Sequence, residues 1–223
     1  MPEPDMSHQR RMMVDGQIRT FGVTDNAVID RFLAVPRENF VGAELADLAY
    51  SDAGLRISGR PPRMLLAPMV LARMIQGAQP KAASRVLDIG GGLGYSCAIL
   101  AGLVAKVVTV ESDAARGTAT LAACHAIGLG NVTAITGELA SGCPQMGPYD
   151  IIIVNGAIEI EAKSLLAQLA DGGCLIAIVN KPGQVNGQAM RYDASNGVIG
   201  QRALFDATAP VLEGMAALPV FAF

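Results

Sequence analysis

The sequence predicts an α/β fold built on a doubly wound, mostly parallel sheet. From residue 84 to about residue 210, short apolar runs alternate with helical patterns, as in sheets whose parallel strands are joined by crossover helices. A glycine-rich turn, Gly90–Gly94, directly follows one of these runs and precedes a helical pattern. Ligands of open α/β sheets bind at such turns, at the carboxyl edge of the strands. We therefore expect a Rossmann-like sheet with its site at this turn.

The elements of the second part of the chain follow from the same patterns. We expect strands at Arg85–Ile89, Lys106–Val110, Val132–Thr136, Asp150–Val154 and Cys174–Val179. Helices are expected at about Leu93–Leu103, Asp113–Ile127 and Glu161–Leu169, the last ended by Gly172-Gly173. A closing hairpin is expected from Gln188–Tyr192 and Val198–Phe205, with Ser195-Asn196-Gly197 as its turn.

Residues 1–80 read as a helical and loop segment of the same domain, and residues 81–223 as its core. Thr24 and Asp25 are suitable caps for a helix that Pro36 ends. The proline-rich stretch Leu55–Pro68 is expected to be an irregular loop, followed by a helix at Met69–Ile75.

Composition excludes several classes of function. The chain has 223 residues, 17% of them charged, and a net charge of -3, so a basic nucleic-acid-binding face is not expected. Ile89–Ala105, the longest uncharged stretch, contains five glycines and is too short and too polar for a transmembrane helix. The four cysteines form no C-x-x-C pair, and only two histidines accompany them. We therefore expect no metal site, no membrane or nucleic-acid partner, and reduced thiols in the cytoplasm.

The glycine turn has the pattern D-x-G-x-G-x-G from Asp88 to Gly94. It differs from the dinucleotide pattern G-x-G-x-x-G, because Tyr95 occupies the position of the third glycine, and no Gly-Lys-Ser/Thr follows to make a P-loop. The carboxylate of Asp88 would repel a pyrophosphate, but it suits the cationic amino end of S-adenosylmethionine. The turn therefore predicts an S-adenosylmethionine site.

Further acids follow the next two predicted strands. Glu111 lies 17 residues after Gly94 and can accept both hydroxyls of a ribose. Glu138 and Leu139 follow the third strand, where we expect the adenine; Glu138 either contacts it or is a solvated loop acid. The predicted cofactor residues are Asp88, Gly90, Gly91, Gly92, Gly94, Tyr95, Glu111, Glu138 and Leu139. Two alternatives remain open here: a nicotinamide nucleotide, or a glycine turn that binds nothing.

Several segments are similar to one enzyme family. Residues 35–41 read VPRENFV and residues 49–52 read AYSD, similar to the family pattern VPRE.FV…AY.D. Val86–Tyr95 is similar to VLEIGTGSGY, Gly137–Asp150 to GDG…PYD, and Leu169–Leu175 to LKPGGRL. Together these motifs span nearly the whole chain and resemble those of protein-L-isoaspartate O-methyltransferases. The resemblance implies a monomeric cytosolic enzyme that methylates a carboxylate of isoaspartyl residues in damaged proteins.

One loop departs from the family pattern GQTIS.P. Here Met64 stands in place of the threonine and Leu66 in place of the serine, so the hydroxyls that help to hold the substrate carboxylate in the family are absent. Arg60 and Arg63 flank the change; they either clamp a carboxylate or are solvated. Met64 and Leu66 either pack internally or admit an apolar acceptor. Asn155, at the end of the fourth strand, either faces the acceptor or caps the next helix.

Three hypotheses follow for the function. The first is an isoaspartyl-type carboxyl methyltransferase, acting on a protein or peptide. The second keeps the cofactor but methylates another acceptor, such as a small-molecule carboxylate. The third is a non-catalytic module that binds S-adenosylmethionine.

Overall fold

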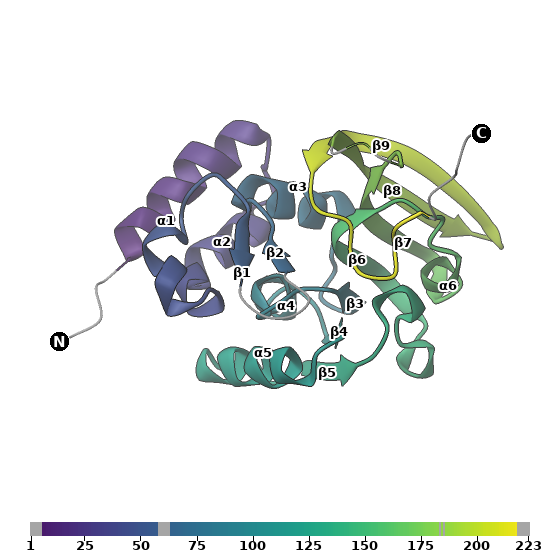
Figure 1. Cartoon of the computed structure of the whole chain (residues 1–223), viewed down its shortest axis with the longest axis horizontal. Coiled ribbons are helices and arrows are strands. Elements are labelled where there is room, and N and C mark those ends of the chain that lie inside the picture. Colours follow the sequence, from purple (N-terminus) through teal and green to yellow (C-terminus); the bar gives the residue numbers. More distant parts are fainter. Residues whose placement is uncertain (1–5, 58–62, 183, 185, 218–223) are drawn as a thin grey trace, which may run out of the picture.

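A seven-stranded sheet with the order β5-β4-β3-β6-β7-β8-β9 forms the centre of the computed structural model (Figure 1). The structure describes residues 6–57, 63–182, 184 and 186–217. Strands β5, β4, β3, β6 and β7 are parallel neighbours, while β8 and β9 are added antiparallel. The strands are β3 (Arg85–Ile89), β4 (Lys106–Glu111), β5 (Val132–Thr136), β6 (Tyr149–Ile158), β7 (Leu169–Asn180), β8 (Asn186–Ser195) and β9 (Val198–Thr208). The α/β, mostly parallel sheet expected from the sequence is confirmed.

Different segments cover the two faces of the sheet. One face packs against the N-terminal helices and α3, α4 and α5, and these elements share one hydrophobic cluster with the inward side chains of β3, β6 and β7. The other face packs against α6 and the chain after β9, through Leu165, Leu212 and Met215. The helices are α1 (Ser7–Met13), α2 (Asn26–Ala34), α3 (Pro68–Ala78), α4 (Tyr95–Ala101), α5 (Ala114–Ala126) and α6 (Lys163–Leu166).

Shorter helical turns complete the chain. A π-helical turn, η1 (Val14–Ile18), and a 3-10 turn, η2 (Arg19–Phe21), extend α1. The remaining 3-10 turns are η3 (Arg37–Phe40), η4 (Ala43–Leu48), η5 (Leu139–Ser141) and η6 (Pro144–Met146). The carboxylate of Asp25 accepts the N–H groups of Ala27 and Val28 at 2.9 and 3.2 Å, and so caps α2 as predicted.

Three local predictions were wrong. The stretch expected to be an irregular loop contains a hairpin of β1 (Leu55–Ile57) and β2 (Arg63–Leu65). Helix α6 ends at Leu166, because the chain then joins β7 and pairs with Tyr149. The two glycines expected to end that helix lie inside β7, where the register with β6 shifts. Gly172, with φ of 79°, accommodates this irregularity.

The closing hairpin has a tighter turn than expected. Ser195 pairs with Val198, so that Asn196 and Gly197 alone form the turn, both with positive φ. This is the backbone that two-residue Asn-Gly turns adopt between antiparallel strands. Within the described residues, no helix is long and apolar enough to span a bilayer.

The strand order determines where a ligand site can form. The first strand of the parallel unit, β3, has β4 on one side and β6 on the other. The chain therefore leaves β3 towards one half of the sheet and later returns to the other half. In open α/β sheets, ligands bind at this reversal, beyond the carboxyl ends of the strands. The glycine turn follows β3 at this point.

Candidate functional site

The turn after β3 has a backbone that requires glycine. Gly90, Gly92 and Gly94 have φ values of 69°, 68° and 93°, a left-handed region that other residues rarely adopt. The N–H of Gly90 donates to the carbonyl of Val110 at 3.0 Å and ties the turn to β4. Gly91 has ordinary φ, but an added Cβ would lie 2.8 Å from Ser96 Oγ. Each of the four positions therefore requires glycine, either for its backbone conformation or for lack of space.

Asp88 lies beneath this turn and is fully buried. Its Oδ1 accepts the side-chain amide of Asn155 at 2.8 Å, and its Oδ2 accepts the hydroxyls of Ser96 and Thr109 at 3.0 and 3.3 Å. Burial raises the pKa of Asp88 to about 6, although these hydrogen bonds oppose the shift. In this arrangement Asp88 joins β3, β4, β6 and α4 around the turn, and its donors are all neutral.

Glu111, at the end of β4, is almost fully buried as well. Its Oε1 accepts the N–H of Gly92 at 2.6 Å, and its Oε2 forms an ion pair with Arg63 Nε at 3.1 Å. Arg116 Nη1 lies 3.8 Å from the same Oε2. Burial raises the pKa of Glu111, whereas the Arg63 charge opposes this shift. The carboxylate expected to meet a ribose is thus already bonded by groups of the chain itself.

Arg63 is neither a solvated loop arginine nor an open clamp. Its side chain is only 2% exposed and pairs with Glu111. Its Nη2 donates to Ser112 Oγ at 2.9 Å and lies 3.9 Å from Glu213 Oε2. Arg60, the other predicted clamp residue, lies outside the described residues.

Tyr95 does not present its ring to the turn. The side chain is fully buried in the core, with the rings of Phe32 and Phe40 at centroid distances of 5.9 and 5.7 Å. The guanidinium of Arg37 lies over the ring at 4.8 Å. The turn directs this ring into the N-terminal helices, so the predicted role of Tyr95 at a cofactor concerns its backbone.

The two residues predicted beside an adenine have different surroundings. Glu138 is exposed and accepts the hydroxyl of Ser141 at 3.2 Å. Leu139 is buried, and its Cδ1 lies 3.5 Å from a Cβ built on Gly90. Leu139 therefore lies at the glycine turn, and Glu138 lies on the surface beyond it.

A cavity of about 400 Å³ lies beside the glycine turn. Its lining residues are Arg56, Arg63, Met64, Asn155, Pro210, Val211, Leu212 and Glu213. Met64 is half-buried, consistent with a wall residue. Both hydrogens of the Asn155 amide are used, by Asp88 and by the carbonyl of Ile89 at 3.1 Å. Asn155 therefore positions Asp88, and its amide has no N–H left to donate to a methyl-accepting substrate.

Leu66 is not among the residues that line this cavity. It is buried, and its carbonyl accepts Arg37 Nη2 at 2.8 Å. Arg37 Nε also donates to the carbonyl of Ala49 at 2.7 Å. A serine at position 66 would therefore not line the cavity in this geometry, and Met64 is the altered loop residue that does.

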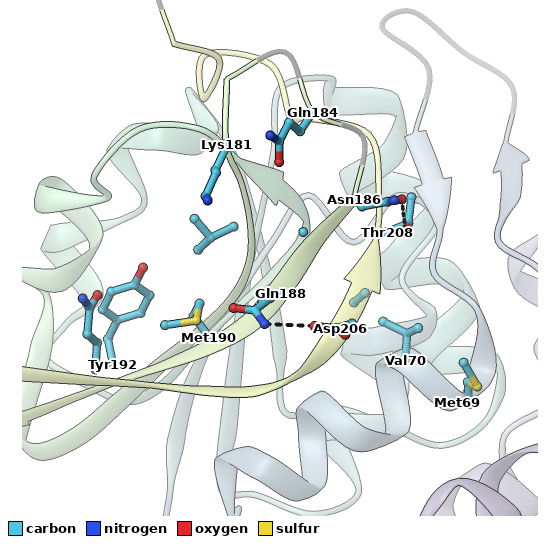
Figure 2. A pocket seen from close by; sticks show the side chains of 14 residues that line it. Met69, Val70, Lys181, Gln184, Asn186, Gln188, Met190, Tyr192, Asp206 and Thr208 are labelled. Atoms are coloured by element: carbon cyan, nitrogen blue, oxygen red, sulfur yellow. Dashed lines mark hydrogen bonds between the residues drawn. The ribbon is translucent and has the colours of Figure 1, made fainter.

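A larger cavity of about 950 Å³ lies elsewhere, along the ends of β7, β8 and β9 (Figure 2). Gln188, Met190 and Tyr192 of β8 face it, and Lys181 reaches it from the end of β7. A hydrogen bond of 2.9 Å joins Gln188 to Asp206 across its floor. The smaller cavity is the better site candidate, because the buried carboxylates and the glycine turn adjoin it.

Several site residues escaped the sequence analysis. Ser96, Thr109 and Ser112 hold Asp88 and Arg63, and Leu212 and Glu213 line the cavity from a segment after the last strand. Single serines and threonines carry little signal in one sequence. The spacing of Thr109, two residues before Glu111 on the same strand, was the one available pointer, since alternate strand residues share a face.

The described residues contain neither a group that could hold a metal ion nor a disulfide. Among them, no three histidine, cysteine or acidic side chains are grouped to hold an ion. Cys97, Cys124, Cys143 and Cys174 are free and buried.

Known proteins match this chain over most of its length. Residues 8–207 match the family described as Protein-L-isoaspartate(D-aspartate) O-methyltransferase (PCMT). A protein-L-isoaspartate O-methyltransferase of Methylorubrum extorquens is 37% identical over 82% of this chain and 78% of its own. A second, from Koribacter versatilis, is 37% identical over 78% of this chain and 77% of its own.

Solved structures agree on the fold. A protein-L-isoaspartate O-methyltransferase superposes with a TM-score of 0.82 and 23% identity, covering 93% of this chain and 67% of that one. A putative Plasmodium falciparum enzyme of this kind, in complex with S-adenosyl-L-homocysteine, has a TM-score of 0.77 and 20% identity over 92% and 98%. With the family match and the relatives above, the conclusion is plain: the chain belongs to the protein-L-isoaspartate(D-aspartate) O-methyltransferase family of S-adenosylmethionine-dependent enzymes.

Proposed function

We propose that this chain transfers a methyl group from S-adenosylmethionine to a carboxylate of isoaspartyl residues in proteins or peptides, in the cytoplasm. The observation that carries the proposal is the glycine turn between two buried carboxylates, Asp88 and Glu111, beside a cavity at the sheet reversal. The four free, buried cysteines fit a reducing compartment.

The residues around the glycine turn have the chemical groups that S-adenosylmethionine requires. A turn of left-handed glycines permits close backbone approach, and Glu111 has the acceptor oxygens that ribose hydroxyls need. Asp88 supports the turn from beneath, and it reaches a cofactor amine only if its neutral donors rearrange. S-adenosylmethionine supplies an electrophilic methyl group on a positively charged sulfur.

The chain itself needs to align and desolvate the acceptor. A carboxylate is already ionised at pH 7, so the reaction requires no strong base. Alignment of two bound groups can contribute about 7–11 kcal/mol in good geometry. Arg56, exposed on β1 and lining the cavity, is the cation we assign to the acceptor carboxylate. Met64, Val211 and Leu212 line the same cavity with apolar groups.

Methyl transfer to a synthetic isoaspartyl peptide, compared with the same peptide containing aspartate, tests the proposal. We expect incorporation with the isoaspartyl peptide alone. Met64→Thr should raise kcat/KM by about tenfold or more, because one hydrogen bond to a charged group contributes roughly 1.5–3 kcal/mol. Leu66→Ser is the matched control: its side chain lies in the core, so it should lower stability without raising turnover.

Absence of methylation by both the wild type and Met64→Thr would overturn the isoaspartyl assignment. The apolar cavity wall favours a second candidate, transfer to a small-molecule carboxylate that carries apolar groups. Turnover on a panel of small carboxylates, without turnover on peptides, would support that reading. Cofactor binding without turnover on any acceptor would support a non-catalytic binding module.

A further inference from the structure

The carboxylate best placed to hold a ribose is covered by the chain. The Glu111 side chain is only 2% exposed, so no ligand hydroxyl can reach its oxygens until a neighbouring group moves. Arg63 covers Oε2 through the 3.1 Å ion pair. Ile57 lies against Gly92, at the place where a Cβ of that residue would be. Access to the predicted ribose position is therefore closed in this structure.

Two of the covering residues come from one hairpin, whereas Arg116, whose Nη1 lies 3.8 Å from Oε2, belongs to α5. Ile57 ends β1 and Arg63 begins β2, and the two residues are paired in register. Among the described residues, β1 and β2 form a separate two-stranded sheet that shares no ladder with the central one. Displacing this hairpin would break no strand pairing of the main sheet. Side-chain contacts hold it in place: Leu55, Ile57 and Leu65 are buried in the main hydrophobic cluster, and Arg63 is the polar fastening to Glu111.

Arg63 links the β1–β2 hairpin to several polar groups around the glycine turn. Its Nε contacts Glu111, its Nη2 donates to Ser112 at 2.9 Å, and Glu213 Oε2 lies 3.9 Å away. Glu213 is half-exposed, unlike Glu111. Two carboxylates thus compete for one guanidinium, one buried at the turn and one at the rim of the cavity.

We infer that Arg63 is a latch residue, which sets cofactor affinity by occupying the Glu111 oxygen that a ribose hydroxyl would take. This inference rests on the proposed function. The cofactor binds only the fraction of molecules in which the ion pair has opened, so the apparent dissociation constant exceeds the intrinsic one by the inverse of that fraction. When the latch opens, ribose hydroxyls replace the guanidinium at Glu111, and Arg63 turns to Glu213.

Titration calorimetry with S-adenosyl-L-homocysteine tests the latch in the full chain. Arg63→Gln removes the charge and keeps an amide of moderate length, and we expect it to bind about tenfold more tightly than the wild type. Arg202→Gln is the control, because it removes an equal charge from exposed β9; its affinity should equal that of the wild type. Glu213→Gln should weaken binding about two- to threefold, because the opened latch loses its second partner. Glu213→Gln also keeps the test decisive if Arg63→Gln folds poorly.

The outcomes separate this inference from the function on which it rests. Tighter binding of S-adenosyl-L-homocysteine by Arg63→Gln than by the wild type, with unchanged binding by Arg202→Gln, supports the latch. Equal affinity of the wild type and Arg63→Gln, or weaker binding by Arg63→Gln, overturns the latch and leaves the proposed function intact. If no variant binds S-adenosyl-L-homocysteine at all, the proposed cofactor use fails and the latch fails with it. Where Arg63→Gln does not fold, unchanged affinity of Glu213→Gln overturns the latch.

Discussion

Asp88 and Glu111 lie at neighbouring strand ends, and both are buried, yet the chain stabilises them by opposite means. Asp88 is surrounded by neutral donors from Asn155, Ser96 and Thr109. Glu111 accepts one backbone N–H and is paired with a guanidinium. Burial raises the pKa of each, but only the second has a cation to oppose the shift directly.

This difference indicates that the two carboxylates have different roles. The donors of Asp88 lie on β4, β6 and α4, elements of the central fold, so this group is part of a fixed frame. The nearer of the two cations at Glu111, Arg63, lies on a hairpin outside the central sheet, so this group can change partners. One carboxylate shapes the turn, and the other is available for exchange with a ligand.

The largest expected effect concerns the ion pair. Glu111→Gln should destabilise the fold by about 3–5 kcal/mol, because it leaves the Arg63 charge buried without its main partner. The double variant Glu111→Gln, Arg63→Gln should recover most of this loss, since neutral groups cost less to bury. Urea unfolding of the wild type, both single variants and the double variant gives the coupling free energy. A double variant whose loss of stability equals the sum of the two single losses would show that the two side chains are not coupled.

Sequence alone predicted the frame of the molecule well. The apolar runs located the five parallel strands, and the D-x-G-x-G-x-G pattern located the turn, because both signals are local. Asn196-Gly197 marked the closing hairpin for the same reason. The family resemblance, confirmed by the comparisons, came from motifs spread over the chain.

Sequence reasoning failed where long-range contacts decide. Arg63 and Glu111 are 48 positions apart, and nothing in either segment indicates that the two side chains meet. The prolines between residues 55 and 68 suggested an irregular loop, but three register pairs are enough to form a hairpin there. Tyr95 follows the glycine turn in sequence, yet the start of α4 directs its ring into the opposite core.

The second effect is a pH dependence at Asp88. Its folded pKa of about 6 lies above the ordinary value of 3.8, so the folded state binds a proton more tightly than the unfolded state does. The wild type should therefore lose stability relative to Asp88→Asn as pH rises from about 4 to about 6, by up to roughly 3 kcal/mol. Above this window the difference should stay level.

Urea unfolding of the two proteins at pH values from 4 to 7 measures this difference, with unchanged m-values as the check that the same transition is followed. A difference that stays constant across the range would mean that Asp88 titrates normally in the fold. In that case burial would not dominate its environment, and the neutral frame described above would be wrong.

The smallest effect tests whether the space around Asp88 is too tight for a side chain at position 91. Gly91→Ala should cost about 1–3 kcal/mol through overpacking, because its Cβ would lie 2.5 Å from Asp88 Oδ2 and 2.8 Å from Ser96 Oγ. Gly137→Ala, in the turn after β5, is the matched control: nothing lies within 4 Å of its Cβ position, so its stability should change by less than about 0.5 kcal/mol. Both glycines have ordinary φ, so backbone strain cannot account for the contrast. Equal stabilities for the two variants would show that the residues around Asp88 shift to accommodate an added methyl group. Asp88 would then be no more rigidly held than Glu111, and it could change hydrogen-bond partners as readily.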